Sequence, residues 1–427
     1  MNDLSSAKFN SSLLTFFQQS REASKRLCEN LEVEDYGLQA IAETSPIKWH
    51  LAHTSWFYET FVLKPFANDY TEFNAAFQHL FNSYYNGVGQ PFKRPNRGLL
   101  SRPTVAEVWR YRQIIDDAIA ELILSLPTAH APNQAALIEQ RIELGIQHEK
   151  QHQELMLTDL KYNFYQNPLL PSYDTAPLSE ITDAPANRTE WYNIESGLYE
   201  VGFSGNGFHF DNETPRHKTY LNSVNIATQL VSNAAFLKFM QDGGYQRPEL
   251  WLSDGWDWVQ SQSLSRPLYW FQNDQQWYEY TLYGPVKLDP SRPLCHVSFY
   301  EADAYARWCG ARLPSEFEWE VYATSASQAD ESTIHSPQWH PNACANNDLQ
   351  QQVWQWTASS YAAYPGFQPP SGAIGEYNGK FMCNQMVLRG GSCLSPPQHT
   401  RLSYRNFFYP ETQWQMSGIR LAQDIDR

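Results

Sequence analysis

The first 165 residues carry hydrophobic positions at the three-to-four-residue period of amphipathic helices. One such segment covers residues 5–27. A second helix is expected over residues 47–63, because Ser45 is a typical N-cap and Pro46 suits the first helical position. Pro65 follows the last hydrophobic position of this segment and should end the helix.

Two further helices follow in the same region. Thr104 and Glu107 form a Thr-x-x-Glu capping box that opens the third helix, and its apolar positions continue as far as Pro127. The fourth helix should begin near Asn133 and run past Asp159. Four amphipathic helices within 165 residues predict a four-helix bundle over residues 1–165.

The pattern changes after the fourth helix. Residues 166–190 are rich in Pro, Asn, Asp and Ser, which is typical of an interdomain linker. Beyond them the chain has short aromatic and β-branched runs separated by glycine, and convincing helical periodicity is confined to three segments, residues 232–241, 298–309 and 315–322. We therefore predict two domains, with an irregular α+β domain over residues 191–427.

Composition excludes several classes of function. The formal net charge is -15 at pH 7, so the chain lacks the basic face that nucleic acids and anionic membranes require. No apolar run reaches the ~20 residues of a membrane span, and the first residues do not resemble a signal peptide. The six cysteines form no CxxC pair, which is typical of a reducing compartment. We expect a cytoplasmic protein that acts on small molecules.

The most informative stretch is His148-Glu-Lys-Gln-His152-Gln-Glu154 within the fourth helix. Its two histidines are four residues apart, so they share one helical face and could bind one metal ion. A third histidine would come from the second helix, where His50 and His53, one helical turn apart, compete for the place. Glu154 is expected to hydrogen-bond to a ligand imidazole. Three neutral nitrogens suit zinc and iron alike.

Around these residues the chain resembles the ergothioneine-type sulfoxide synthases, the hercynine oxygenases. Its first domain resembles their DinB-like four-helix bundle through the Trp49–His53 and His148–Glu154 stretches. The second domain is similar to the C-type-lectin-like fold of formylglycine-generating enzymes (sulfatase-modifying factors). It shares the stretches Cys295-His296-Val297-Ser298, Ala311-Arg312-Leu313-Pro314-Ser315-Glu316, Leu388-Arg389-Gly390-Gly391-Ser392 and Gly418-Ile419-Arg420-Leu421.

The resemblance implies a specific chemistry. The family holds Fe(II) with three histidines, which correspond here to His53, His148 and His152. It uses O2 to join a thiol sulfur to the imidazole C2 of hercynine as a sulfoxide, in ergothioneine biosynthesis. Gln151 corresponds to a glutamine that contacts the hercynine ring. Asn406 corresponds to a residue near its trimethylammonium and carboxylate groups, and the aromatic Phe407 and Phe408 accompany it.

The sequence departs from family members that use γ-glutamylcysteine. Those members carry an Asp and an Arg where this chain has Phe408 and Thr412, so a dipeptide would lose two charged partners. The pair Tyr84 and Tyr85 resembles that of the cysteine-accepting subgroup, in which one tyrosine donates a proton. By the same resemblance, the cysteine carboxylate is assigned to arginines of the same loop, Arg94 and Arg97. We expect a small thiol, cysteine, as the sulfur donor.

Several alternatives remain open, among them a DinB-like zinc hydrolase or thiol transferase, which the second domain disfavours. A selenoneine-type synthase, which joins hercynine to a selenosugar, also has no need of the missing Asp and Arg. An ovothiol-forming synthase would usually continue into a methyltransferase domain, and no glycine-rich nucleotide loop is found. A non-catalytic binding protein with structural zinc would explain the two domains, but it does not explain the tyrosine pair.

Overall fold

A computed structural model describes four stretches of the chain: residues 3–178, 190–327, 338–343 and 349–425. By their internal contacts the residues form two compact units. The helical unit comprises Met1–Gln166 together with Pro369–Tyr377, and the mixed unit comprises Asn167–Gln368 and Asn378–Arg427. Within the linker predicted from the sequence, residues 179–189 lie outside the described residues.

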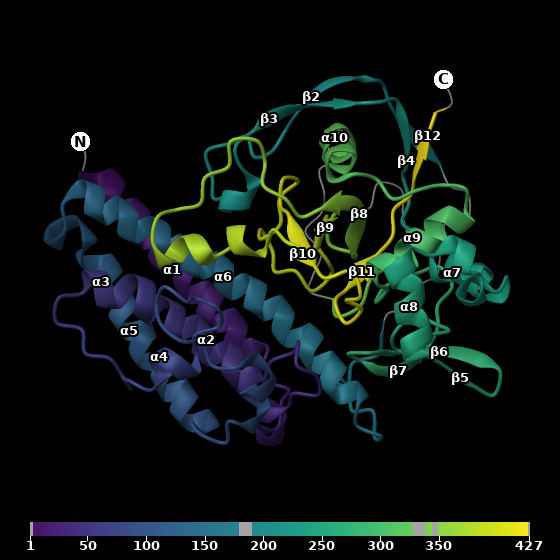
Figure 1. The fold of residues 1–427 in the computed structure, drawn as a ribbon. Coiled ribbons are helices and arrows are strands. Elements are labelled where there is room, and N and C mark those ends of the chain that lie inside the picture. Colours follow the sequence, from purple (N-terminus) through teal and green to yellow (C-terminus); the bar gives the residue numbers. More distant parts are fainter. Residues whose placement is uncertain (1–2, 179–189, 328–337, 344–348, 426–427) are drawn as a thin grey trace. The chain divides into compact units, whose positions relative to one another are not determined.

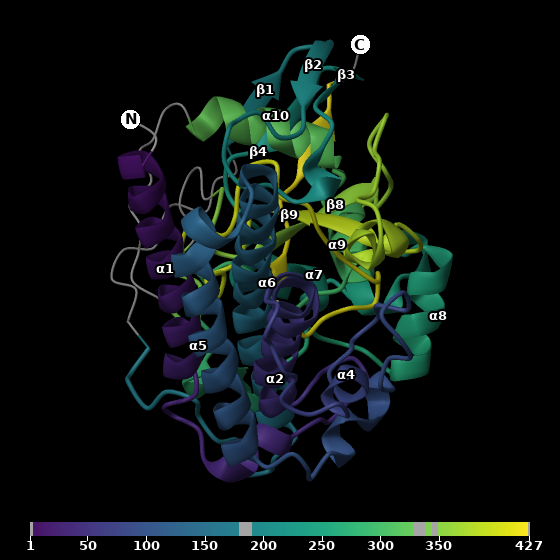
Figure 2. The ribbon, with the colours of Figure 1, turned by 90° about the vertical axis from the view of Figure 1, so that its left-hand side faces the viewer.

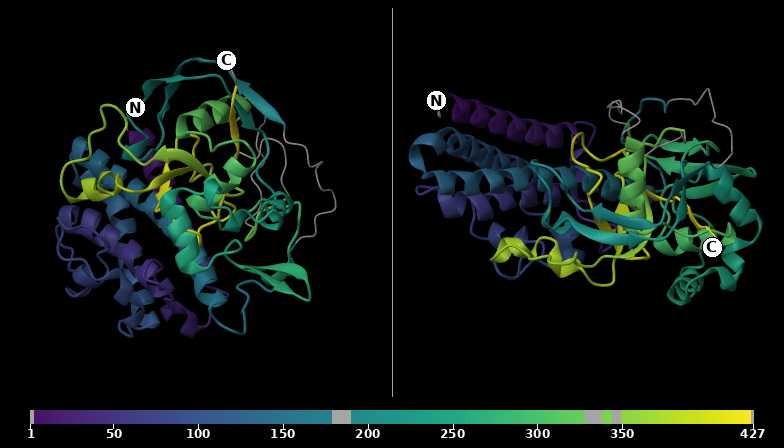
Figure 3. Two further views of the ribbon diagram at one scale, coloured as in Figure 1. Left: turned by 45° about the vertical axis from the view of Figure 1, so that its right-hand side comes forward. Right: turned by 90° about the horizontal axis from the view of Figure 1, so that it is seen from above.

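The helical unit is built on four long helices, as the sequence pattern predicts (Figures 1 and 2). α1 packs against α5 and α6, and α2 packs against the same two helices, which makes a four-helix bundle. The right-hand panel of Figure 3 shows the helices lengthwise. Their bounds are α1 (Asp3–Arg26), α2 (Ile47–Tyr58), α5 (Val105–Ala129) and α6 (Pro132–Tyr165).

The beginning of α2 differs from the prediction. Pro46 occupies the cap position, and the helix starts at Ile47 without a side-chain cap. The Ser45 hydroxyl instead accepts a hydrogen bond from Arg97 Nη1 at 2.9 Å, so the predicted N-cap role of Ser45 is wrong. A π-helical turn, Glu59–Leu63, continues α2, and such turns are frequent at functional sites.

Every residue of α2 is buried, because the helix packs against α5, α6 and the 3-10 turn Val33–Gly37. Its close approach to α6 depends on a glycine. A Cβ atom on Gly145 of α6 would come within 2.4 Å of the Tyr58 ring. Any larger side chain at this position would push the two helices apart, and these are the helices that carry the candidate metal ligands.

The connection between α2 and α5 is ordered. It contains the short helices α3 (Lys64–Phe66) and α4 (Phe77–Leu80) and a 3-10 turn at Arg94–Leu99. The predicted capping box at the start of α5 is confirmed, because Thr104 and Glu107 satisfy each other's backbone N–H groups. The helix ends at Ala129, slightly beyond the predicted end.

Within its described residues, the mixed unit contains four small sheets and four α-helices. The strand orders are β1-β4-β12, β10-β9-β8-β11, β2-β3 and β5-β6-β7, and all neighbours are antiparallel except β8 and β11. The strands are β1 (Trp191–Ile194), β2 (Gly197–Val201), β3 (His217–Leu221), β4 (Val224–Ala227), β5 (Trp270–Asn273), β6 (Gln276–Thr281), β7 (Gly284–Lys287), β8 (Trp354–Ser360), β9 (Met386–Arg389), β10 (Asn406–Phe408), β11 (Ser417–Gly418) and β12 (Ala422–Asp424). The helices are α7 (Asn233–Gln241), α8 (Ser253–Gln262), α9 (Phe299–Trp308) and α10 (Glu316–Ser327).

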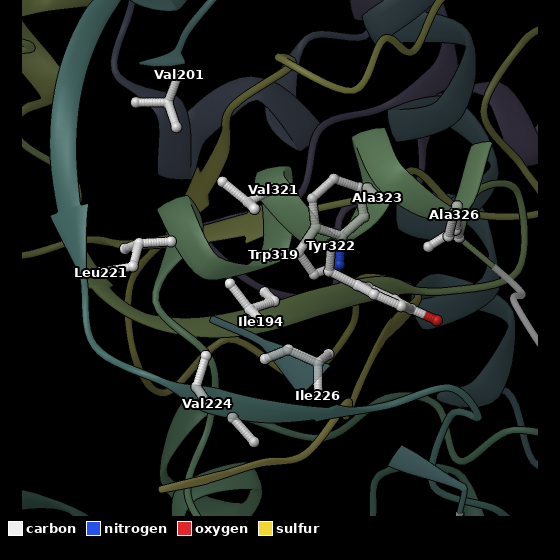
Figure 4. Packing of buried hydrophobic residues seen from close by; sticks show 12 residues of the cluster. Ile194, Val201, Leu221, Val224, Ile226, Trp319, Val321, Tyr322, Ala323 and Ala326 are labelled. Atoms are coloured by element: carbon white, nitrogen blue, oxygen red, sulfur yellow. The ribbon is translucent and has the colours of Figure 1, made fainter. Parts of the chain in front are cut away.

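One face of α10 forms a core of this unit. Trp319 and Tyr322 of α10 lie against Ile194 of β1 and Ile226 of β4 (Figure 4). The predicted α+β class is therefore confirmed. One detail differs: α8 was not among the three helical segments predicted for this region. None of the helices in the described stretches has the length and apolar character needed to cross a membrane.

Candidate metal centre

Three histidine rings converge between α2 and α6. The ring centroids of His53 and His148 are 4.9 Å apart, and those of His53 and His152 are 4.8 Å apart. The rings of His148 and His152, one helical turn apart on α6, are separated by 4.5 Å. One nitrogen from each ring lies within 4.8 Å of the other two. The cluster thus has the compactness that one metal ion requires.

The hydrogen bonds of His53 fix which of its nitrogens faces the cluster. His53 Nδ1 donates to the backbone carbonyl oxygen of Phe81 at 2.6 Å, and a carbonyl can only accept. The lone pair of a neutral ring therefore lies on Nε2. This atom is buried and has no hydrogen-bond partner within the described residues. A buried acceptor without a hydrogen-bond donor is uncommon in proteins, and a metal ion would bind its lone pair.

A second chain of hydrogen bonds fixes His152. His50 Nε2 lies 3.1 Å from Asp159 Oδ2, so this nitrogen carries the proton donated to the carboxylate. His50 Nδ1 is then an acceptor, and it lies 2.8 Å from His152 Nδ1, which must donate. The lone pair of His152 is consequently on Nε2. His50 lies outside the cluster and orients one of its members.

Burial keeps all three rings neutral. It lowers the pKa of His148 to about 3, and it lowers the pKa values of His53 and His152 well below the usual 6.5. The neighbouring imidazoles act in the same direction on His53 and His152, because each additional positive charge would repel the others. Neutral imidazole is the form that binds metal. The donor set and its protonation therefore fit a divalent zinc or iron ion.

The tyrosine pair lies against the same part of α2. The Tyr85 ring is fully buried, 5.6 Å from the Trp56 ring, and Trp56 stacks on His53 with 5.5 Å between centroids. Tyr84 stacks on Tyr85 at 4.5 Å, and their hydroxyl oxygens are 3.4 Å apart. Burial raises the pKa of Tyr85 well above 10, so its hydroxyl keeps its proton at neutral pH.

A third tyrosine, which the sequence patterns did not single out, joins this group from residues 369–377. The Tyr377 hydroxyl donates to Gln151 Oε1, and its ring centroid is 5.6 Å from that of His148. The adjacent Glu376 accepts hydrogen bonds from the backbone N–H groups of Asn86 and Gly87, at 3.0 and 2.7 Å. These contacts join residues 369–377 to the loop that carries the tyrosine pair.

The two loop arginines have different environments. Arg94 is exposed, whereas Arg97 is only 2% exposed and its guanidinium carbon lies 3.4 Å from the centre of the Trp49 ring. Arg97 donates to the hydroxyls of Ser45 and Ser83. No carboxylate in the described stretches forms an ion pair with it. Burial lowers the pKa of Arg97 well below 12.5, so the site disfavours the cation unless an anion accompanies it.

The remaining predicted substrate residues belong to the mixed unit. Asn406, Phe407 and Phe408 form β10 and are partly buried. Phe407 stacks on Tyr361 with 4.0 Å between centroids. Thr412 is buried, with 2% exposure.

The acidic residues near the histidines on α6 have distinct surroundings. Glu154, predicted to orient a ligand imidazole, is buried. The His152 ring donates from Nδ1 to His50 Nδ1. Glu149, which the sequence reading did not assign, accepts hydrogen bonds from Arg21, Arg112 and Ser24 in the bundle interior.

Comparisons with known proteins agree with this architecture. Residues 17–156 match the DinB superfamily, and residues 178–336 and 323–425 match the sulfatase-modifying factor enzyme 1-like domain. A hercynine oxygenase from Mycolicibacterium smegmatis is 31% identical over 317 residues, covering 67% of this chain and 72% of the relative. A hercynine oxygenase from Mycolicibacterium thermoresistibile is 27% identical over 415 residues, covering 90% and 88%. The solved structure of PvdO from Pseudomonas aeruginosa aligns with a TM-score of 0.38 at 17% identity, covering 58% of this chain and 98% of that one.

The order of the two domains and these matches define an oxygen-dependent oxidoreductase. More narrowly, the chain belongs to the hercynine oxygenase family.

Proposed function

We propose that the protein is an iron(II)-dependent sulfoxide synthase that joins the imidazole C2 of hercynine to the sulfur of a small thiol, cysteine. The observation that carries this proposal is the three-histidine cluster, in which His53 and His152 have their lone pairs on Nε2, in a chain of the hercynine oxygenase family. In the overall reaction the C2–H and S–H bonds are replaced by a C–S bond. One oxygen atom of O2 becomes the sulfoxide and the other leaves as water.

Iron would be held by His53, His148 and His152, and when bound it would supply the means of activating O2. The protein's own hydrogen bonds orient two of these ligands, because Phe81 O and His50 select the tautomers of His53 and His152. Less reorganisation is then needed when the ion binds.

The tyrosine pair would supply a proton. Reduction of O2 to water needs protons, and a phenol can donate one from its hydroxyl. Tyr85 has the required protonation state, since burial raises its pKa. Tyr84 lies within 3.4 Å of the Tyr85 hydroxyl and could pass a proton to it or take its place.

Arg97 would bind the carboxylate of the thiol substrate. Its guanidinium is buried without an acidic partner among the described residues, and its two hydroxyl partners are neutral. A substrate carboxylate would offset the cost of burying this charge. The exposed Arg94 would add attraction for the same anion.

The mixed unit supports a small donor. Phe408 and Thr412 stand where γ-glutamylcysteine-using members carry charged residues. For hercynine, the partly buried Asn406 and Phe407 of β10 would lie near the quaternary ammonium, a group that aromatic rings bind.

A direct comparison of donors tests the proposal. Reduced, iron-loaded protein would be supplied with hercynine, O2 and either cysteine, γ-glutamylcysteine or a selenosugar, and the products identified by mass. We expect the cysteine sulfoxide adduct to form fastest. Faster reaction with γ-glutamylcysteine or the selenosugar would overturn the assigned donor, and no hercynine adduct with any of the three would overturn the proposed activity.

A further inference from the structure

A second group of metal-binding side chains lies in the core of the mixed unit. Glu279, Cys295 and His340 each offer one ligand atom, and these atoms all lie within 4.8 Å of one another. The three residues are 2%, 1% and 1% exposed, respectively. They come from three separate segments: strand β6, the connection between β7 and α9, and the described stretch 338–343.

Backbone contacts hold each segment in place. Glu279 lies in the central strand of the β5-β6-β7 sheet, where it pairs with Trp270 on one side and Val286 on the other. Next to Cys295, the Leu294 N–H donates to Val231 O at 2.8 Å. Next to His340, Pro341 O accepts a hydrogen bond from Arg292. The three donors are therefore positioned by the fold itself.

His340 Nε2 and Glu279 Oε1 are 3.2 Å apart. The simplest explanation of this distance is a hydrogen bond between the two side chains. Two ligand atoms on a tetrahedral zinc ion are also separated by about 3.4 Å, given zinc–ligand bonds of about 2.1 Å. The distance therefore suits both arrangements. The Cys295 thiol adds a third ligand atom within reach of both groups, which a histidine–carboxylate hydrogen bond does not use.

The chemistry of the group favours a cation. Zinc binds cysteine as the thiolate and histidine as the neutral imidazole, so the bound ion would face two anionic ligands, the carboxylate and the thiolate. A divalent ion offsets both charges at once. The combination of one sulfur, one nitrogen and one oxygen donor suits zinc, whereas calcium and magnesium prefer oxygen ligands alone.

We propose that Glu279, Cys295 and His340 bind a zinc ion, with water as the fourth ligand, that fastens the β5-β6-β7 sheet to the segments around Cys295 and His340. All three ligands belong to the mixed unit, so the site is chemically separate from the three-histidine cluster. The inference does not depend on the proposed activity.

The test begins with the full chain carrying His148→Ala and His152→Ala, which removes the other candidate metal centre. We expect this variant to retain about one equivalent of zinc by elemental analysis. Replacing the zinc by cobalt(II) should produce a thiolate-to-cobalt charge-transfer band in the near ultraviolet, because only a sulfur ligand gives that absorption.

Adding Cys295→Ser should abolish the band and lower zinc retention at least tenfold. Cys28→Ser is the matched control, since Cys28 is also a buried cysteine but lies in the helical unit, and it should change neither readout. If the Cys295 variant fails to fold, the spectrum of the parent variant still decides. No stoichiometric metal and no charge-transfer band in the parent, or a band that survives Cys295→Ser, would overturn the proposal.

Discussion

Helix α6 buries two polar faces that differ in how completely they are satisfied. On one face Glu149 accepts hydrogen bonds from Ser24 at 2.6 Å, Arg112 at 2.8 Å and Arg21 at 3.0 Å. On the other, His148 and His152 meet His53, whose buried Nε2 has no hydrogen-bond partner in the described part of the chain. His148 and Glu149 are neighbours in sequence. His148 lies among other neutral imidazoles, whereas Glu149 lies among two arginines and a serine hydroxyl.

The comparison separates a structural network from a candidate reactive site. Around Glu149, opposite charges and a hydroxyl complete the hydrogen bonding, so the network stabilises the bundle. Around the histidines, desolvation keeps the rings neutral and leaves lone pairs available. Changes on the first face should alter stability, and changes on the second should alter metal binding and chemistry.

The largest effect is expected from His53→Ala. Loss of one of three ligands should abolish stoichiometric iron(II) binding and sulfoxide formation, while the circular dichroism spectrum stays that of the folded protein. His79→Ala, which changes an exposed histidine on α4, should leave both activities intact. If His50→Ala removes iron and His53→Ala does not, the ligand assignment is wrong.

Removing the tyrosine hydroxyls should affect chemistry without releasing iron. Changing Tyr84 and Tyr85 singly to Phe should slow coupling in at least one variant by about 10²–10⁴-fold, the usual contribution of a general acid, or divert the thiol to sulfinic acid. Product ratios by mass analysis provide the measurement. Tyr70→Phe is the matched control, since Tyr70 donates to Glu59 instead. Full coupling in both variants would remove the pair from the mechanism.

Glu149→Gln should act on stability. Burial by itself would raise the pKa of Glu149, but Arg21, Arg112 and the hydrogen bonds from Ser24 and Arg112 lower it to about 2. A fall from 4.5 to about 2 corresponds to about 3 kcal/mol. Because the folded pKa is the lower one, this stabilisation is present above pH 4.5 and is lost as the pH falls through 2.

Urea unfolding should therefore show a deficit of about 3 kcal/mol for Glu149→Gln at pH 7, within the range for breaking a buried ion pair. The deficit should shrink as the pH is lowered from 4.5 toward 2. The iron content of the variant should match that of the wild type. A deficit that does not change over this pH range would show that the charge of Glu149 is not the source of the stabilisation.

The smallest effect is expected from Asp159→Asn, which acts through His50. The amide no longer fixes the His50 tautomer, so His152 loses its oriented acceptor, and iron affinity should fall about 10–100-fold, as for other groups that orient metal ligands. Asp116→Asn is the matched control, because Asp116 pairs with Arg21 of α1 and not with a histidine. Equal iron affinities in the wild type and the Asp159 variant would show that Asp159 does not orient His152 through His50.

Sequence patterns were sufficient to predict those elements whose structure depends on interactions between residues close in sequence. The four helices and the Thr104–Glu107 capping box follow from periodicity and short-range hydrogen bonds, and both are confirmed. The expected N-cap role of Ser45 is wrong. Its hydroxyl accepts a hydrogen bond from Arg97, which is 52 positions away in the sequence. The four-residue spacing of His148 and His152 correctly indicated that they share a face.

Long-range contacts account for what the sequence could not predict. Tyr377 lies 226 residues from Gln151, in a segment whose glycine and proline content suggests only a loop. The role of His50 depends on Asp159, which is 109 residues away. No periodic pattern encodes such pairings, because they arise from the packing of separate elements.

The most direct test of the three-histidine centre is the nitric oxide complex of the anaerobic, iron(II)-loaded wild-type protein, followed by electron paramagnetic resonance. We predict a stoichiometric iron–nitrosyl signal whose shape changes when hercynine is added. A three-histidine site that takes zinc in preference to iron and gives no nitrosyl signal, or a signal that hercynine leaves unchanged, would contradict the account.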